Sequence, residues 1–199
     1  MDPLFLPDVE NNPQPDSPYA ALIQQAIAGG REYPKIWHLF AFKPSATQHL
    51  AQFTQEVMRE EAPLSPGFRE LIAARTSRRN DCPFLLKSHA AVAAVLLGNE
   101  DLVQKVLEDI DSSPLTDAEK LLMHFLDKVN HDSPRITPAD MEPLHAAGWT
   151  DEQIYYAITV CALFNFYNRW IDATGVHPLS DEAHREGAKR SAGAGYVRE

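Results

Sequence analysis

The sequence predicts an all-α protein, a helical bundle, on three observations. Apolar residues recur at helical spacing over most of the chain after residue 15. Two capping boxes begin at Thr116 and Thr150, where the threonine and a residue three positions later each satisfy the other's backbone N–H. No segment alternates apolar and polar residues as a half-buried strand does, and no glycine-rich phosphate loop follows a strand.

The first half of the chain divides into an arm and a series of helical segments. Residues 1–15 contain four prolines and two asparagines and are predicted to form an extended N-terminal arm. Ser17-Pro18 and Gly29-Gly30 are typical of a helix start and a helix stop, and the stretch 36–42 is too apolar for a free surface loop. Helices are expected over 19–28 and over about 45–60, 65–77, 83–97 and 100–109.

The second half carries clearer helix signals. Helices are expected over about 116–129, 137–147, 150–173 and 181–191, with Gly148 and Gly175 as stop residues. Residues 154–171 are apolar nearly all round, so we expect this helix to be the buried centre of the bundle or of an oligomer. No linker divides the chain, which predicts a single domain over residues 16–199.

The composition excludes several classes of protein. With 18 basic and 28 acidic residues the net charge is -10, whereas a nucleic-acid binder normally has a basic face. No apolar run reaches the roughly 18–20 residues of a membrane span, and the start of the chain lacks the pattern of a signal peptide. Two cysteines cannot form a disulfide framework and fit a reducing compartment. We therefore expect an acidic cytoplasmic protein that binds neither nucleic acid nor a membrane.

Glu70 is the first residue with candidate chemistry. It shares a helix face with the small residues Ala73, Ala74 and Ser77, which let another helix come close and bury the carboxylate. Burial raises the pKa of a carboxylate, the condition for a base that works near neutral pH. The alternative interpretation is a solvent-facing charge on an alanine-rich face.

Cys82 and His89 form a second candidate cluster. Cys82 is expected at the N-cap of the helix that begins with Pro83, where the positive end of a helix favours a thiolate. Cys82, Leu85 and His89 stand at positions i, i+3 and i+7, so His89 can reach back toward the sulfur. The alternative is an apolar core stripe that happens to include a histidine. The short connection at 78–81 predicts that the helices bearing Glu70 and His89 are antiparallel neighbours.

The pattern of Glu70, Asn80, Cys82 and His89 resembles the signature of the alkylhydroperoxidase AhpD and carboxymuconolactone decarboxylase superfamily, and more narrowly its uncharacterised peroxidase-related branch. The segments 33–34, 115–120, 147–154 and 164–169 also fit that branch, so the resemblance covers about residues 33–175. It implies an AhpD-like helical bundle, a small-molecule substrate and a homo-oligomer. The eight histidines are scattered and no His-Glu-x-x-His motif occurs, so neither a metal nor another cofactor is expected.

The resemblance also implies roles for individual residues. Redox members of the superfamily carry Cys-x-x-Cys, in which the second cysteine attacks the peroxide and the first resolves it as a disulfide. Glu70 would then be the proton acceptor, His89 the relay and Cys82 the surviving thiol. Leu85 stands where the attacking thiol would be. Asn165 and Asn168 are further candidates for the pocket wall, whereas Cys161 lies in an apolar run and is expected to be a buried structural cysteine.

Three hypotheses for function follow. The first is a peroxidase-related oxidoreductase that acts through Cys82 on hydroperoxides or another small oxidised substrate, with an external thiol as reductant and an activity that is weak or lost. The second is an acid–base enzyme like the decarboxylases, in which Glu70 and His89 work and Cys82 is incidental. The third is a non-catalytic oligomer that binds a ligand. We expect Glu70, Cys82 and His89 to converge on one common pocket, with Glu70 largely buried.

Overall fold

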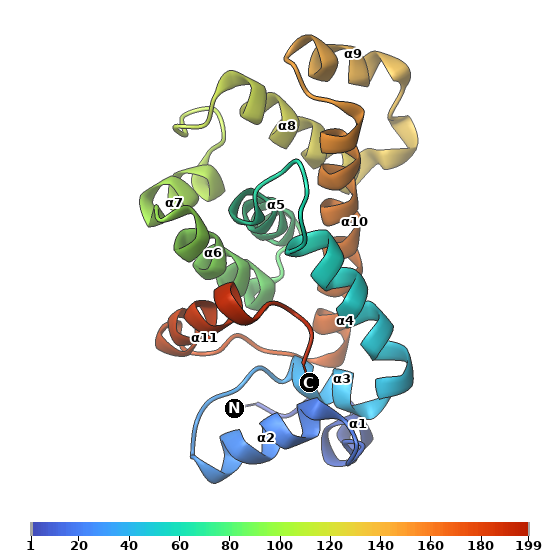
Figure 1. Cartoon of the computed structure of the whole chain (residues 1–199), viewed down its shortest axis with the longest axis vertical. Coiled ribbons are helices and arrows are strands. Elements are labelled where there is room, and N and C mark those ends of the chain that lie inside the picture. Colours follow the sequence, from blue (N-terminus) through green and yellow to red (C-terminus); the bar gives the residue numbers. More distant parts are fainter. Residues whose placement is uncertain (1, 199) are drawn as a thin grey trace.

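This computed structural model describes residues 2–198, in which helices are joined by short turns and loops and no strand occurs (Figure 1). The all-α prediction is confirmed. The elements are α1 (Pro7–Asn11), α2 (Pro18–Ala28), α3 (Ile36–Phe42), α4 (Pro44–Met58), α5 (Pro66–Arg79), α6 (Pro83–Leu97), α7 (Glu100–Glu108), α8 (Asp117–Asp132), the 3-10 turn η1 (Ser133–Arg135), α9 (Pro138–Ala146), α10 (Asp151–Thr174) and α11 (Asp181–Ala194). Each helix of that set is too short or too polar to cross a membrane.

Local sequence signals set most of the helix ends. Both predicted capping boxes form, at Thr116 before α8 and at Thr150 before α10. Gly98 and Gly175 follow α6 and α10 with φ of 63° and 80°, the left-handed conformation that a residue with a Cβ adopts only at a cost. Six of these α-helices, among them α5 and α6, have proline in the first turn, where the N–H that proline lacks would have no partner within the helix.

The first residues of the chain are not the extended arm that was predicted. Residues 7–11 form α1, and Leu4 is only 3% exposed in the core. Backbone hydrogen bonds connect Phe5 N–H to Thr174 O (3.0 Å) and Gln14 N–H to Ala41 O (2.8 Å). Proline content suggested an extended chain, but burial of one leucine and these backbone contacts hold the segment against α3 and the end of α10.

The most buried element is α5, which lies at the centre of Figure 1. Ten of its 14 residues are buried. It packs against α6 in the predicted antiparallel sense, because the start of α5 meets the end of α6. A Cβ on Gly67 would lie only 2.7 Å from Leu97 Cδ2. The connection between them is short, and Asp81 within it adopts φ of 52°. This helix pair fixes the relative positions of Glu70 and His89.

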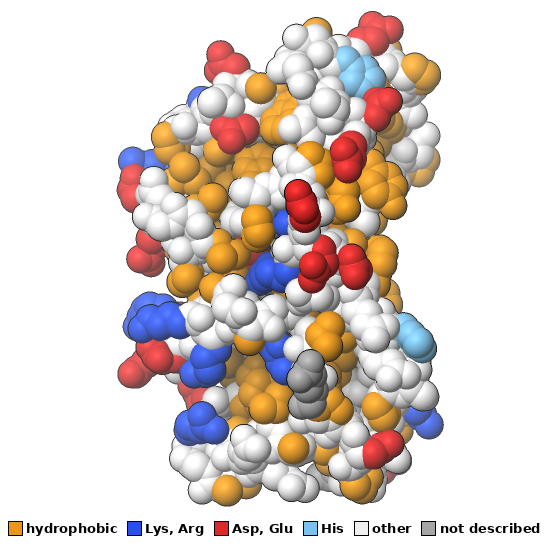
Figure 2. Space-filling view, in the orientation of Figure 1, with side chains coloured by type: hydrophobic (Ala, Val, Ile, Leu, Met, Phe, Trp, Pro, Cys, Tyr) orange, Lys and Arg blue, Asp and Glu red, His pale blue; other side chains and the backbone are white. Residues whose placement is uncertain are grey.

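One face of α10 is less buried than its apolar sequence predicted. Val160, Cys161 and Ile171 are completely buried, but Tyr155 is 64% exposed and Phe166 is 48% exposed. Apolar side chains are accordingly visible at the surface along the edge where α4 and α10 run (Figure 2). The helix is therefore half covered within one chain, and its burial in an oligomer stays a prediction.

Candidate active site

Glu70 is completely buried between α5 and α6. Its neighbours on the helix face, Ala73, Ala74 and Ser77, are also 0% exposed, as expected for small residues that let a second helix approach. On the facing helix, His89 is 7% exposed. His89 Nδ1 lies 2.5 Å from Glu70 Oε2, so the structure brings these two predicted residues together.

Two further groups contact the other oxygen of this carboxylate. Arg59 Nη1 lies 2.7 Å from Glu70 Oε1, and the Tyr196 hydroxyl donates a hydrogen bond of 2.6 Å to the same atom. The Arg59 guanidinium also lies over the Tyr196 ring, 4.7 Å from its centroid. Glu70 is thus the centre of a buried cluster of four side chains, the Glu70 cluster: Arg59, Glu70, His89 and Tyr196.

The pKa of Glu70 is lowered, and our expectation of a raised pKa was wrong. Burial by itself raises it, but the contacts with His89, Arg59 and Tyr196 together favour the ionised carboxylate more strongly. Burial and the adjacent Glu70 charge also raise the pKa of Tyr196 well above its usual value, so the phenol keeps its proton and remains a donor. Glu70 is consequently an ionised group that orients and stabilises its neighbours.

Arg59 and Tyr196 were not predicted from the sequence, because they lie in segments without a recognisable motif. Arg59 follows the last residue of α4, and Tyr196 lies in residues 195–198 after α11, here called the closing segment. The Tyr196 N–H donates to Gln55 Oε1 (2.8 Å), and the Tyr19 hydroxyl donates to the Tyr196 carbonyl (3.2 Å). These contacts fix the phenol over the carboxylate.

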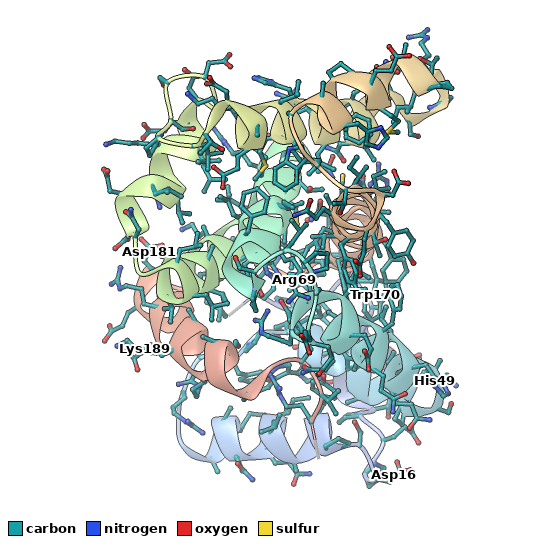
Figure 3. All side chains as sticks on the ribbon, turned by 45° about the horizontal axis from the view of Figure 1, so that its top comes forward. Asp16, His49, Arg69, Trp170, Asp181 and Lys189 are labelled. Carbon is teal, nitrogen blue, oxygen red and sulfur yellow. The ribbon has the colours of Figure 1, made fainter. Side chains whose placement is uncertain are left out.

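Arg69, labelled in Figure 3, holds the backbone on either side of Arg59 in place. It is 1% exposed, and its guanidinium donates to the carbonyls of Val57 and Glu60, both at 2.9 Å. Those carbonyls flank Arg59 in the chain. Arg69 and Glu70 are consecutive on α5, so one helix turn holds both the carboxylate and the backbone that delivers its counter-ion.

A cavity of about 150 Å³ lies beside His89. Leu85, Ser88 and Val92 of α6 form part of its wall, so Leu85 is a pocket residue as predicted. The rest of the wall is largely aromatic and includes Trp37, Phe40, Phe84, Phe164, Tyr167 and Tyr196. Because His89 Nδ1 contacts Glu70, the other ring nitrogen, Nε2, is the one available to a molecule in this cavity.

Cys82 does not join this site in the way that its spacing suggested. It is the N-cap residue of α6, as predicted, but it is 0% exposed and is absent from the cavity wall. Burial raises the pKa of its thiol to about 12, and the nearby Asp172 carboxylate adds to the increase. The expected tendency toward thiolate was therefore wrong, because desolvation outweighs the effect of the helix N-terminus.

Asn165 and Asn168 lie in a separate polar network rather than in the cavity wall. Asn80 Nδ2 donates to Asn168 Oδ1 (2.7 Å), and Asn168 Nδ2 donates to Ser77 Oγ (3.0 Å). Asn165 Nδ2 donates to Asn130 Oδ1 (2.5 Å). These amides connect α5, α8 and α10, a structural role. Cys161 is 0% exposed beside them, in agreement with a buried structural cysteine.

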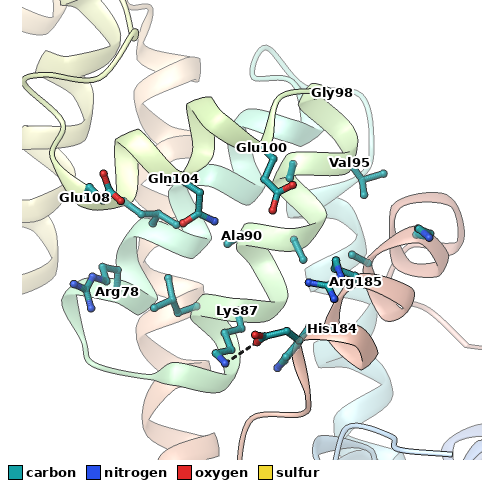
Figure 4. Close-up of a pocket in the computed structure, with 17 residues that line it drawn as sticks. Arg78, Lys87, Ala90, Val95, Gly98, Glu100, Gln104, Glu108, His184 and Arg185 are labelled. Carbon is teal, nitrogen blue, oxygen red and sulfur yellow. Dashed lines mark hydrogen bonds and ion pairs between the residues drawn. The ribbon is translucent and has the colours of Figure 1, made fainter.

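A larger and more open groove of about 750 Å³ lies between α6, α7 and α11 (Figure 4). Its one histidine, His184, has both ring nitrogens engaged, Nδ1 with Ser88 Oγ (3.1 Å) and Nε2 with the Leu179 N–H (3.1 Å). Burial lowers the pKa of His184 to about 4, so the imidazole is neutral at pH 7. This histidine is held as a structural group, which leaves the His89 cavity as the better candidate for chemistry.

Comparison with solved structures shows that the chain has the helical fold of AhpD-like proteins. No family model matches the sequence, and no curated protein is similar to it. Among solved structures, it is similar to an alkylhydroperoxidase AhpD core protein, an uncharacterised peroxidase-related protein from Ralstonia eutropha JMP134. The TM-score is 0.74 at 22% identity, over 94% of this chain and 93% of that one.

A second solved structure similar to this chain is also a peroxidase-related protein. The chain is similar to an uncharacterised peroxidase-related protein from Silicibacter sp. TM1040, with a TM-score of 0.79 at 27% identity, over 92% of this chain and 95% of that one. These similarities extend well beyond residues 33–175. They confirm that the chain resembles the AhpD-like, peroxidase-related branch, as the sequence predicted.

Proposed function

We propose that the protein is an acid–base enzyme of the AhpD-like superfamily that moves a proton on a small, mainly apolar substrate. One observation carries this proposal. His89 contacts a completely buried, ionised Glu70 through Nδ1 while its ring lines the apolar cavity. A carboxylate that holds one imidazole nitrogen fixes the tautomer and leaves the other nitrogen as a proton acceptor.

Each member of the Glu70 cluster has a defined part in such a reaction. His89 Nε2 takes a proton from the substrate, and the positive imidazolium that forms is stabilised by Glu70 across the 2.5 Å contact. Arg59 and Tyr196 keep Glu70 ionised, so the carboxylate stays an acceptor and does not take the proton itself. His89 then returns the proton to the substrate at another atom, and the enzyme is regenerated without a net change.

Proton transfer can be measured without knowing the natural substrate. A panel of small cyclic ketones and lactones, with and without a carboxyl group, is incubated in D₂O, and loss of the α-proton signals is followed by NMR. Glu70→Gln and His89→Gln should slow any exchange by roughly 100-fold or more. Cys82→Ser should leave it unchanged. Exchange that survives His89→Gln but is lost in Cys82→Ser would refute the proposal.

A second candidate function is hydroperoxide reduction through Cys82 with Glu70 and His89. The peroxidase-related neighbours and the position of Cys82 at the start of α6 favour it. The Cys82 thiolate would attack a peroxide oxygen and break the O–O bond, giving sulfenic acid and, after protonation of the leaving alkoxide, an alcohol. One external thiol would condense with the sulfenic acid to a mixed disulfide with release of water, and a second would free Cys82 and leave as the external disulfide. Consumption of one thiol per chain by cumene hydroperoxide, absent in Cys82→Ser, would support this function.

A homo-oligomer is also proposed. The exposed aromatic residues Tyr155 and Phe166 on α10 are the supporting observation, since large apolar side chains at a surface are commonly covered by a partner. A symmetric assembly of this chain would cover this face in every subunit. If no substrate is turned over, the third hypothesis, a non-catalytic oligomer that binds a ligand, becomes the better description.

A further inference from the structure

We propose that the His89 cavity binds one neutral, flat ring of about six atoms that carries a single hydroxyl or carbonyl group. The inference names the ligand of the site described above. It rests on the proposed proton transfer only for what happens to the ligand after binding. Volume, wall shape and charge each point to this class of molecule.

The volume of the cavity limits the size of the ligand. A dry, apolar protein cavity of about 150 Å³ holds one benzene molecule. The His89 cavity has about this volume and offers a wall of the same kind, with Leu85 and Val92 on one side and Ala51 on α4. A fused two-ring molecule or a long alkyl chain would therefore extend out of the apolar space toward the open side of the cavity, or would require the walls to move.

The shape of the wall favours a flat ligand. The Phe164 ring meets the His89 ring edge-on, with centroids 4.4 Å apart at 77°. On another side the Tyr196 ring is nearly parallel to His89, with centroids 6.5 Å apart at 12°. Rings that surround a space in these two orientations offer both faces and edges to a guest ring, the arrangements that aromatic pairs prefer.

Most of the polar groups in the wall are already engaged. Ser88 Oγ contacts His184, Tyr167 shares a hydrogen bond of 2.7 Å with Thr54, and the Tyr19 hydroxyl donates to the Tyr196 carbonyl. Beside the Glu70 cluster His89 Nε2 is the group left to contact the ligand, whereas the Trp37 indole and the Ser191 hydroxyl belong to the parts of the wall that come from α3 and α11. One such nitrogen satisfies one hydroxyl or carbonyl group, which is why the ligand should carry a single polar group.

The charges near the cavity oppose an anionic ligand. Glu70 is ionised, and its counter-ion Arg59 is already paired with it at 2.7 Å. Arg198 also lines the cavity, but its Nη1 donates to the carbonyls of Gly195 and Val197 within the closing segment. An anion would lose its hydration in an apolar space without a cation committed to it, and this is costly.

Ring probes test size and charge directly on the full chain. Phenol, 2-cyclohexenone, benzoate and 1-naphthol are titrated at pH 7.5, with NMR shifts of the His89 ring and the Trp37 indole as the readout. Phenol and cyclohexenone should bind at least tenfold more tightly than benzoate and 1-naphthol. Benzoate binding more tightly than phenol would overturn the assignment of a neutral ligand, and equal binding of naphthol would overturn the size.

A filled cavity locates the binding site. Ala51→Leu places a larger side chain in the wall and should weaken phenol binding at least tenfold, whereas Ala162→Leu on the exposed face of α10 should leave it unchanged. Phenol binding unchanged by a folded Ala51→Leu variant would place the ligand elsewhere. If that variant does not fold, the probe series on the natural chain still decides size and charge.

The two proposals can fail separately. Phenol binding with no exchange activity that depends on His89 would leave the ligand inference standing and the proposed reaction refuted. Exchange that depends on Glu70 and His89 but occurs only with carboxylate-bearing substrates would support the proposed reaction and refute the inference of a neutral ligand.

Discussion

Replacing Tyr196 with phenylalanine tests the Glu70 cluster most directly. The substitution removes one hydroxyl and keeps the ring that contacts Arg59 and lines the cavity. The lost interaction is the 2.6 Å hydrogen bond to Glu70 Oε1, on a carboxylate that is 0% exposed. Arg59 and His89 remain in contact with Glu70, so the variant should fold with a weakened cluster.

The size of the effect follows from the charge on the acceptor. A hydrogen bond to a charged group contributes about 1.5–3 kcal/mol, and one pKa unit corresponds to about 1.4 kcal/mol. The free energy of unfolding at pH 7 should therefore fall by about 1.5–3 kcal/mol, and the folded-state pKa of Glu70 should rise, because one of the contacts that lower it is lost.

The effect must also depend on pH. The pKa of Glu70 is lowered in the folded state. Its contribution to stability is therefore complete above the unfolded glutamate pKa of about 4.3 and is lost as the pH falls through the folded-state pKa. The difference in stability between the natural chain and the variant should be constant above about pH 5 and should shrink below about pH 4.

Urea unfolding between pH 3.5 and 8, with Tyr167→Phe as the matched control, measures this difference. Tyr167 is a second buried tyrosine of the same cavity, but its hydroxyl contacts the neutral Thr54. Its loss should cost about 0.5–1.5 kcal/mol at every pH. If the two variants lose equal free energies of unfolding at every pH, the hydrogen bond from Tyr196 to the Glu70 carboxylate contributes no more than one to a neutral group. That result would refute this account of Glu70.

The remaining predictions concern the thiol, the oligomer and the closing segment. Leu85→Cys should restore a Cys-x-x-Cys pair with Cys82 and raise hydroperoxide reduction when a dithiol is supplied; an equal rate in the natural chain would mean that Cys82 is competent by itself. Light scattering should give a multiple of 22.3 kDa, and a mass near 22 kDa at micromolar concentration would contradict the oligomer. Gly195→Ala should lower stability by about 1–3 kcal/mol, because φ is 67° and a Cβ would clash with Gln55 Oε1; an unchanged unfolding midpoint would contradict that strain.

The fold could be predicted because its signals are local. Caps, helix-starting prolines and stop glycines each act within one turn of the chain, and Thr116, Thr150 and Gly175 behave as predicted. The helix α1 and the packing of the segment around it were missed, because they depend on distant contacts such as that of Phe5 with Thr174. Proline content cannot report such contacts.

Residues of the site that are close in the sequence could likewise be predicted, whereas those brought together by distant packing could not. Glu70 and His89 are 19 residues apart on consecutive antiparallel helices, so spacing alone could place them together. Tyr196 is 126 residues from Glu70, and only the packing of α11 brings it there. The environment of Cys82 was misjudged for a similar reason, because Asp172 and the surrounding core come from α10.

The distance along the chain between Glu70 and Tyr196 has a consequence for the order of folding. The contacts between α5 and α6 close a short loop and can form early, whereas the closing segment must return across 126 residues. Interactions absent from the folding transition state act on the unfolding rate. We therefore expect the Tyr196 contact to form late and to act mainly on the unfolding rate, so that it sets how long the native site persists once it has formed.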